Sequence, residues 1–311
     1  GPGRPLGPDE ALLVEEDSTG ATYLVHNGHR GAVNLDDPAV RLAYNLTGVV
    51  PRKVSTGLLN AIPEGHALDP PDILGAGQRP FPQLGDARVG DVVQVNRAGR
   101  QEYFLVLTQG VQQVERAVAD LIRFDRGNRP RFTEVAPEAI AAVPPAPPAV
   151  RQDFSDFPAQ VPAVRTIPEA PITCLVWRGP QQPPVVTVSP GEQLPLGKDN
   201  NAVQVPGAVR GQTADKVFLE PGKGALVRGV VPGQRPDTGT IWLVNDQGFA
   251  YRVPSLPVAR ALGLGEKTTP APESILRLLK VGVSLDPQQA LALFDPQLAQ
   301  QRAEQQRQDG G

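Results

Sequence analysis

The sequence predicts an α+β fold in which one small module, a β-hairpin followed by two short helices, is repeated along the chain. Two distant segments share a pattern: residues 23–33 read YLVHNGHRGAV and residues 241–253 read IWLVNDQGFAYRV. Each contains an aliphatic run, a polar turn with glycine and a second run, which is typical of a β-hairpin. Units of roughly 50 residues bury little surface alone, so we expect them to pack together.

The turns of these two hairpins differ in predicted length. Asn27-Gly28 suits a tight type I′ turn, because both central residues need a positive φ angle and these residue types tolerate it. Asp246-Gln247-Gly248 supplies a slightly longer turn. Both hairpins are therefore predicted from their turn chemistry as well as from their apolar runs.

The segments after each hairpin carry helix start and stop signals. After the first hairpin, Asp37 is the predicted N-cap and Pro38 takes the first helical position, where its missing N–H costs nothing. After the second hairpin, Ser255 is the predicted cap and Gly263 the stop. The predicted first helices lie within 36–48 and 255–265, and the predicted second helices lie within 54–65 and 271–282.

A third copy of the module lies between these two. The hairpin pattern recurs at 101–114 with Gly110 at the turn, a helical pattern follows at 113–124, and residues 135–144 take the second-helix place. A fourth candidate at 216–230 has the strand-turn-strand part only. The alternative is a chance recurrence, because short hairpin-helix patterns are easily found in any α+β protein.

The region between the second and last copies has a different character. Residues 136–171 contain nine prolines, which favour extended segments, and short strands are predicted at 172–177 and 183–188. We expect a separate β-rich central domain here. The expected organisation is 1–11 tag remnant and linker, 12–70 first module, 82–145 second module, 150–230 central domain, 231–294 last module with a partial fourth at 216–230, and 295–311 polar tail.

The composition excludes several broad classes. Hydrophobic residues make up 40% of the 311 residues and charged residues 20%, so the chain can bury a core. The formal net charge of -3 argues against nucleic acid as a partner held by charge alone. No run approaches 18 apolar residues, so no membrane span is predicted in this sequence. Gly1-Pro2 and the absence of methionine indicate a piece excised from a longer protein.

A phosphate-binding loop is the first chemical motif that the sequence fails to complete. A P-loop needs two glycines separated by four residues, then Lys and a hydroxyl residue, because backbone amides wrap the phosphates and the hydroxyl holds Mg²⁺. In residues 191–200, five residues separate Gly191 from Gly197, and Asp199 follows Lys198 where the hydroxyl belongs. Pro195 removes one amide of the cradle. We interpret this stretch as a β-turn loop.

The histidines pose the second chemical question. His26 and His29 flank the Asn27-Gly28 turn, and His66 lies beyond two predicted helices. A zinc site needs three or four ligands, so we favour an exposed turn over a metal site. Cys174 stands alone in an apolar run, and we expect a buried, inert thiol. The sequence therefore predicts no catalytic, cofactor-binding or metal-ligating residue.

The repeats resemble the extracytoplasmic region of EccB, a core membrane component of mycobacterial type VII (ESX) secretion systems. The resemblance rests on ATYLVHNGHRGAVNL, on VSTGLLNAIPEGHAL and on IWLVNDQGFAYRV followed by ARALGL. Ile62-Pro63-Glu64-Gly65 matches the family's LP.G step, whereas Val281 replaces the proline in the last copy. The resemblance covers nearly the whole chain in order.

This resemblance implies an elongated periplasmic part with a central β-rich body flanked by repeat domains. It also implies a single transmembrane helix outside this sequence and a position on the periplasmic side of the inner membrane of mycobacteria or related actinobacteria. The implied partners are other EccB copies, EccC, EccD, EccE and the mycosin protease. Many members carry a disulfide in this region, and the lone Cys174 departs from that pattern.

Three functions follow as hypotheses. The first is a structural and assembly component of the secretion complex that associates with itself. The second is a cell-wall module that binds peptidoglycan through repeated weak sites, although aromatic residues are only 5% of the chain. The third is the ATP hydrolase that family names often give, for which this chain offers no Walker motif.

Overall fold

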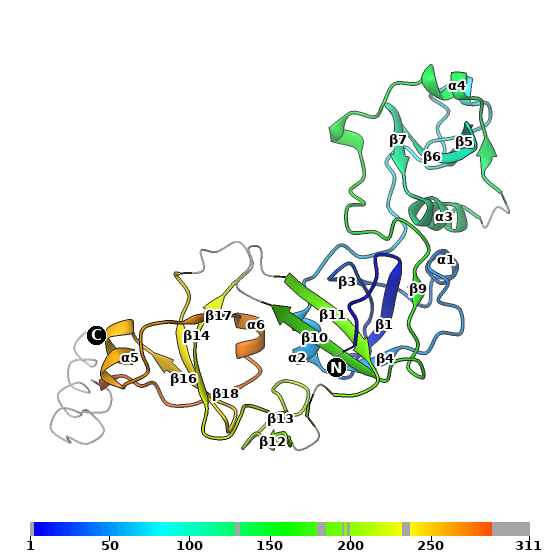
Figure 1. Cartoon of the computed structure of the whole chain (residues 1–311). Helices are drawn as coiled ribbons and strands as arrows, with labels where there is room; N and C mark the ends of the chain where they lie inside the picture. Colours follow the sequence, from blue (N-terminus) through cyan, green and yellow to red (C-terminus); the bar gives the residue numbers. More distant parts are fainter. Residues whose placement is uncertain are drawn as a thin grey trace, which may run out of the picture. The chain divides into compact units, whose positions relative to one another are not determined.

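The computed structural model describes residues 3–127, 131–178, 185–194, 196–197, 200–231 and 237–287 (Figure 1). The described residues divide into two compact units. Unit 1 comprises those of Gly1–Val54, Ile62–Leu175 and Thr187–Leu194, and unit 2 comprises those of Ser55–Ala61, Val176–Val186 and Pro195–Gly311. Unit 1 contains module 2 and all of module 1 except its second helix, and unit 2 contains module 3, so the fold is α+β and built on repetition, as predicted.

Each module contains a four-stranded sheet with the same strand order. Three strands form an antiparallel meander, and the fourth pairs in parallel with the first, so the order is third, second, first, fourth. The strands of module 1 are β1 (Glu10–Glu16), β2 (Thr22–His26), β3 (His29–Ala32) and β4 (Arg52–Val54). Those of module 2 are β5 (Val92–Arg97), β6 (Arg100–Leu107), β7 (Gly110–Val114) and β8 (Thr133–Glu134). Those of module 3 are β14 (Gly224–Val230), β15 (Ile241–Asn245), β16 (Phe249–Val253) and β17 (Thr269–Pro272).

The two helices of each module occupy fixed places in this order. The first helix connects the third strand to the fourth, and the second helix follows the fourth strand. The first helices are α1 (Pro38–Ala43), α3 (Arg116–Asp125) and α5 (Leu256–Ala261), and the second helices are α2 (Thr56–Ala61), α4 (Pro137–Ala141) and α6 (Glu273–Leu276). Although α2 follows module 1 in sequence, it belongs to unit 2 and packs against α6 there.

The segment after each second helix returns to the third strand. Arg30 bridges Glu64 and Val111 bridges Pro145, both in parallel, and β16 pairs in parallel with β18 (Lys280–Val281). This fifth position explains the family's LP.G step, because the chain must turn at once from the helix into extended backbone. The last module makes the same pairing, but Lys280 and not Val281 stands in place of the proline, because Val281 pairs with Ala250 as Glu64 does with Arg30.

The predicted turns and caps are confirmed. Asn27 and Gly28 both have positive φ angles, of 46° and 78°, as a type I′ turn requires. The Ala39 N–H donates to the Asp37 carboxylate over 2.7 Å, and Ser255 accepts from the Val258 N–H. The turn and cap residues on which the module prediction depended therefore adopt the predicted conformations.

The structure differs from the prediction at the first strand of each module. The expected hairpin at 216–230 does not form, because β13 (Lys216–Val217) pairs with β12 (Val203–Gln204) whereas β14 pairs with β15. The stretch thus supplies the first strand of module 3 and is no fourth module. The first strands β1 and β5 likewise lie ahead of the hairpins recognised in the sequence.

Residues 150–230, expected to form one central domain, are distributed over both units. Strand β9 (Ala163–Val164) pairs with β1 in unit 1, and β14 belongs to the sheet of unit 2. The predicted strands near 172–177 and 183–188 are present as the ribbon of β10 (Ile172–Arg178) and β11 (Val185–Gly191). Whether the expected ranges fold independently stays a prediction. The polar tail at 295–311 lies outside the described residues.

Both faces of the module 2 sheet are buried. Leu105, Leu107 and Tyr103 of β6 pack with Val118 and Ile122 of α3 on one face. The other face carries a separate cluster that includes Val93, Val95, Val106 and, from α4, Ile140. Strand alternation sends successive residues to opposite faces, so two helices suffice to cover one small sheet. Within the part of the chain that the structure describes, no helix is long and apolar enough to cross a membrane.

Candidate functional site

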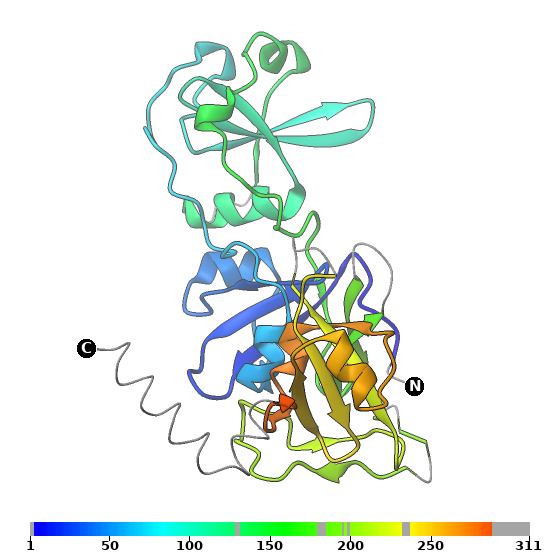
Figure 2. The same cartoon turned by 90° about the vertical axis from the view of Figure 1, so that its left-hand side faces the viewer.

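The most extensive contact between modules in unit 1 is helix on helix. Helices α1 and α3 lie side by side (Figures 1 and 2). They hold the equivalent place in modules 1 and 2, so the two modules meet through the same element. The shared cluster contains Val40, Ala43, Tyr44 and Leu46 from the α1 region and Ala117 and Leu121 from α3. All six are at most 2% exposed, so this contact is a continuous piece of hydrophobic core.

Helix α5 can be aligned with α1 residue by residue from its C-terminal hydrogen bonds. After α1, Asn45 takes a φ of 54° and the Leu46 N–H donates to the Arg41 carbonyl over 2.8 Å. After α5, Gly263 takes a φ of 73° and the Leu264 N–H donates to the Ala259 carbonyl over 2.9 Å. Both helices thus end in the same left-handed cap.

This alignment maps the buried face of α1 onto an open face of α5. Val258, Ala261, Leu262 and Leu264 occupy the places of Val40, Ala43, Tyr44 and Leu46. We call these four residues the α5 face. Tyr44 is fully buried, whereas Leu262 is 49% exposed, and Ala261 is also exposed. Val258 and Leu264 are half-buried, since they also contact the core of module 3. Among the residues that the structure describes, the α5 face is therefore an open counterpart of a surface that is covered in module 1.

Two of the three histidines, His26 and His66, lie near one aspartate of the proline-rich segment. His66 Nδ1 is 2.8 Å from Asp156 Oδ2, and the His66 backbone N–H donates to the same oxygen over 3.2 Å. His26 is buried, and its Nδ1 has no hydrogen-bond partner. Burial, followed by the charge of His29, lowers the pKa of His26 below its usual value, and Asp156 opposes that shift.

The hairpin interpretation of this stretch is confirmed, and His29 is exposed as expected. His26 differs from the expectation, because it lies in β2 with its side chain in the interior. Among residues that the structure describes, no group of three His, Cys, Asp or Glu side chains could hold a metal ion. No local pattern pointed to Asp156 as the common neighbour, since it lies 90 residues from His66.

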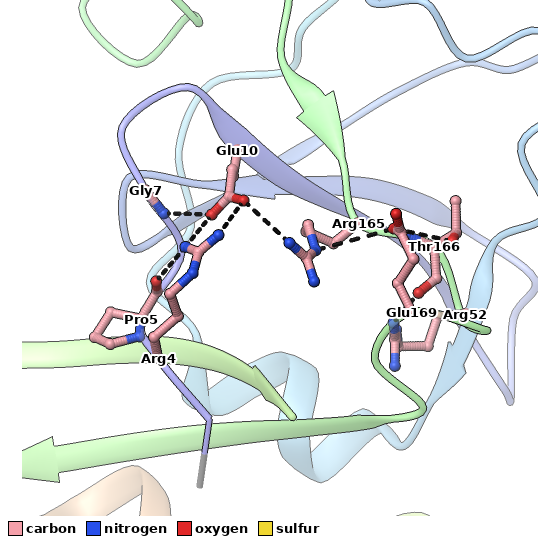
Figure 3. A network of polar contacts seen from close by, with 8 residues as sticks. All are labelled: Arg4, Pro5, Gly7, Glu10, Arg52, Arg165, Thr166 and Glu169. Atoms are coloured by element: carbon pink, nitrogen blue, oxygen red, sulfur yellow. Dashed lines mark hydrogen bonds and ion pairs between the residues drawn. The ribbon is translucent and has the colours of Figure 1, made fainter. Parts of the chain in front are cut away.

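A polar network ties the N-terminal segment and β9 to β1 (Figure 3). Arg4 donates to Glu10 over 2.6 Å, and Arg165 lies 3.5 Å from the same carboxylate. The hydrogen bond from Arg4, followed by one from the Gly7 N–H, lowers the pKa of Glu10 to about 2. Arg165 also pairs with Glu169 across 3.9 Å. The network lines part of a hollow of about 390 Å³ beside β11.

Arg52 stands at the far end of this network. Its guanidinium is buried, donates to the Thr166 carbonyl over 3.4 Å through Nη2, and has no partner at Nη1. Burial lowers its pKa. The side chain anchors β4 to the segment after β9, so we assign the network a structural role.

Two other sequence candidates are placed by the structure. Cys174 lies in β10, is half-buried, and burial raises the pKa of its thiol, which keeps it protonated and weakly reactive. Gly191 is the last residue of β11. Pro195, Lys198 and Asp199 of the loop that resembles a P-loop lie outside the described residues.

Comparisons with known proteins agree on one family. The family model described as "Type VII secretion system ESX-1, transport TM domain B" matches residues 1–297. The "ESX-3 secretion system ATPase EccB3" of Mycolicibacterium smegmatis is 32% identical over 308 residues, covering 94% of this chain and 58% of that protein. The "ESX-5 secretion system ATPase EccB5" of Mycobacterium marinum is 30% identical over 293 residues, covering 89% and 56%.

Solved structures show the same fold. The periplasmic assembly from the ESX-5 inner membrane complex aligns with a TM-score of 0.74 at 28% identity, covering 91% of this chain and 70% of that chain. The EccB3 dimer from the ESX-3 core complex aligns with a TM-score of 0.72 at 28% identity, covering 91% and 73%. The chain spans 56–59% of the length of the curated relatives it matches. With the family model matched over nearly its whole length and the repeated modules in the same fold, this chain belongs to the EccB family of type VII secretion proteins.

Proposed function

We propose that this chain is a structural and assembly component of the periplasmic part of a type VII secretion membrane complex, and that it associates with copies of itself. The observation that carries the proposal is the packing of module on module through equivalent helices, α1 on α3. The relatives are a periplasmic assembly and a dimer by description. A protein built of such modules offers several similar apolar surfaces for docking.

The polar groups of the modules support this role, because they stabilise the modules themselves. Asp120 of α3 is buried and accepts hydrogen bonds from Arg116 over 2.6 Å and from Arg123 over 2.7 Å. Arg116 also donates to the Tyr103 hydroxyl over 2.6 Å. These bonds fix α3 on its sheet. A helix held rigidly loses less conformational entropy when it docks, which favours assembly.

The finer parts of the proposal concern place and partners. We propose a position on the periplasmic side of the inner membrane, as part of a single-pass membrane protein, and contacts with EccC, EccD, EccE and the mycosin protease. These assignments follow from the family and from the complexes in which the solved relatives lie.

The test is assembly in membranes. The full-length protein that contains this chain would be expressed with residues 230–290 deleted, and the secretion complex would be sized on native gels after detergent extraction. We expect loss or shrinkage of the complex. A matched surface substitution, Ala98→Asn in the exposed β5–β6 turn, should leave the size unchanged, because Asn tolerates the positive φ of 50° at this position. A complex of normal size after removal of module 3 would contradict the proposal.

A second candidate, cell-wall binding, is favoured by a repeated aromatic residue. Tyr23, Phe104 and Trp242 occupy equivalent positions on the second strands of the three modules. Each lies two residues before the residue of its own strand that pairs with Arg30, Val111 or Ala250 of the third strand. All three are half-buried. Tyr23 and Phe104 line hollows of about 460 and 490 Å³. An aromatic ring beside a polar hollow can stack on a sugar.

This candidate is tested by pull-down of the chain on purified peptidoglycan. Retention that falls when Tyr23 and Phe104 are both replaced by Ala would support it, and the absence of retention at micromolar chain would contradict it. The word ATPase in the relatives' names has no supporting motif in this sequence. Calorimetric titration with ATP and Mg²⁺ tests it, and we expect no heat of binding.

A further inference from the structure

We propose that the edge of the module 3 sheet at residues 280–285 is a docking site for an extended, acidic segment of a partner protein, which adds a strand beside β18. This inference rests on the proposed assembly role and names one surface that serves it. Its physical basis is that the equivalent edges of modules 1 and 2 are blocked, whereas that of module 3 is open among the residues that the structure describes.

The first step is the direction of the backbone groups in this edge segment. The Gly282 N–H donates to the Ala250 carbonyl of β16 over 3.0 Å. Successive residues of a strand direct their N–H and C=O groups to opposite sides, so those of Val281 and Val283 point away from β16. Within the described part of the chain, no strand lies beyond β18 in this sheet. The outward groups of both valines can therefore pair with an added strand.

In module 2 the same edge cannot accept a strand in this way, because its outward residues are prolines. Pro145 pairs with the third strand of module 2 as Val281 pairs with that of module 3, so Pro147 is the counterpart of Val283. Neither proline has an N–H to donate.

In module 1 the same edge is covered by another segment. The counterparts of the two valines are Glu64 and His66, and the His66 N–H already donates to the Asp156 carboxylate over 3.2 Å. A Cβ added to Gly65 would also meet Asp156 at 3.2 Å. Charge, proline and a covering segment are the usual means of protecting a sheet edge, and modules 1 and 2 together use all three.

The two outward positions of module 3 carry none of these protections among the described residues. Val281 is 59% exposed and Val283 is 72% exposed, and both are β-branched residues that favour a strand. Between them, Gly282 lies against the Tyr251 ring, where a Cβ would clash. This close packing holds the edge segment on its sheet, so an added strand meets a preformed edge.

The chemistry of the edge identifies its occupant. A row of outward N–H and C=O groups is matched by another extended backbone, and exposed valines favour apolar β-branched neighbours. Lys280 lies on the face of Phe249 and Arg252 on the opposite face, and neither pairs with a carboxylate among the described residues. Acidic side chains in the added strand would complement both cations. A second copy would instead bring the same cations to the contact, where like charges repel.

The experiment measures binding of a synthetic peptide to the whole chain by fluorescence anisotropy. The labelled probe is EVTVTVTE, which favours a strand and places its two glutamates on opposite faces. We expect saturable, submillimolar binding. KVTVTVTK should bind at least about tenfold more weakly, because it sets like charges against Lys280 and Arg252. Two N-methylated forms, each blocking every second amide, should differ in affinity by at least about tenfold, because only one set of amides faces the edge.

The decisive variant is Val281→Pro, which gives module 3 the residue that module 2 has at this place, so the module fold has a precedent for it. Loss of the outward N–H should weaken binding of EVTVTVTE at least about tenfold. The matched control, Val281→Thr, keeps the N–H and the β-branched shape and should bind within about threefold of the unsubstituted chain. Undiminished binding by a folded Val281→Pro chain would contradict strand addition.

A second measurement covers the case in which Val281→Pro fails to fold, as judged by circular dichroism. Amide hydrogen exchange of the unsubstituted chain, followed by NMR, should slow at Val281 and Val283 when the peptide saturates the chain. Equal affinity of the two N-methylated forms, unchanged exchange at both valines, or no peptide binding up to millimolar concentration would overturn the inference. Slower exchange with rising chain concentration alone would mean that a second copy takes the edge, which would also overturn it. Complex assembly in membranes tests the proposed function separately.

Discussion

Modules 1 and 3 share one strand order and one helix cap, yet they use their first helix in opposite ways. In module 1, α1 is sealed against α3, and Tyr44 is fully buried. In module 3, the equivalent helix α5 leaves Leu262 half in solvent. The fold of the module does not therefore depend on a partner for its first helix. That independence leaves the outer face of the helix available for joining modules.

The difference also shows where each module obtains its stability. The sheet of module 3 has its own clusters on both faces, one with α6 and one with α5. Module 1 adds to this arrangement the cluster shared with module 2. We therefore expect substitutions on the buried face of α1 to affect unfolding strongly and substitutions on the α5 face to affect it little.

The largest expected effect contrasts the two equivalent positions directly. Tyr44→Ala should lower the free energy of unfolding by about 3–5 kcal/mol, because it leaves a cavity where an aromatic ring was buried. Leu262→Ala should cost below about 1 kcal/mol when measured on the monomer, since half of that side chain is already hydrated. Urea unfolding followed by circular dichroism measures both. Equal losses of unfolding free energy in the two variants would show that the α5 face contributes as much to folding stability as the buried face of α1, against this comparison.

A second contrast compares the ion pairs of the two helices. Asp120 is 5% exposed and paired with two arginines, whereas Glu266, in the loop after α5, pairs with Arg260 and its side chain is 54% exposed. Asp120→Ala should cost about 2–3 kcal/mol, because it leaves Arg123 largely buried without this carboxylate. Glu266→Ala should cost below about 0.5 kcal/mol. The same unfolding assay decides, and a large loss for Glu266→Ala would contradict the contrast.

The parts of this fold that could be predicted from sequence are the turns and helix caps, which depend on residues close together in the chain. Asn27-Gly28, Asp37-Pro38 and Ser255 each act within a few residues, and each is found in the predicted conformation. Strand β14 was assigned to a hairpin of its own because Pro221-Gly222 precedes it, whereas ten residues separate it from its actual partner β15. Parallel pairing of β4 with β1 depends on contacts some 38 residues apart, which no local pattern encodes.

The exposure of the α5 face was out of reach of the sequence for a related reason. Val258, Ala261 and Leu262 read as an ordinary core-facing helix stripe, and the periodicity of α1 is the same. Only the structure shows that one stripe is covered and the other is open. The grouping of His26 and His66 near Asp156 was equally hidden, because the aspartate comes from a proline-rich segment that has no periodicity.

A third test asks whether the ties of module 1 to the flanking segments are electrostatic. The pKa of Glu10 is lowered from 4.5 to about 2, chiefly by the hydrogen bond from Arg4. A carboxyl group whose pKa is depressed on folding stabilises the protein above its unfolded pKa, and this contribution is lost as pH falls from about 4.5 to about 2.

Glu10→Gln should therefore lower the free energy of unfolding at pH 7 by about 1 kcal/mol, a reduced figure because the Arg4 side chain is 62% exposed. The difference between the two proteins should shrink at pH 3. Asp86→Asn is the matched control, since Asp86 is 92% exposed and pairs only at the surface with Arg79. A pH-independent difference for Glu10→Gln would rule out the electrostatic explanation.

The smallest expected effect compares the hairpin turns of the same two modules. The residue before the turn is His26 in module 1 and Asn245 in module 3, where the side-chain oxygen accepts the Gln247 and Phe249 N–H groups over 3.2 and 2.9 Å. Burial lowers the pKa of His26, so the unfolded chain binds a proton there that the folded chain resists. His26 thus supports the fold above pH 6.5, and this support declines as pH falls below that value.

His26→Asn should remove this part of the acid sensitivity, with His29 and His66 unchanged as internal controls. Urea unfolding at pH 7.5 and pH 5 measures it, and equal pH dependence in both proteins would show that His26 does not resist protonation in the fold.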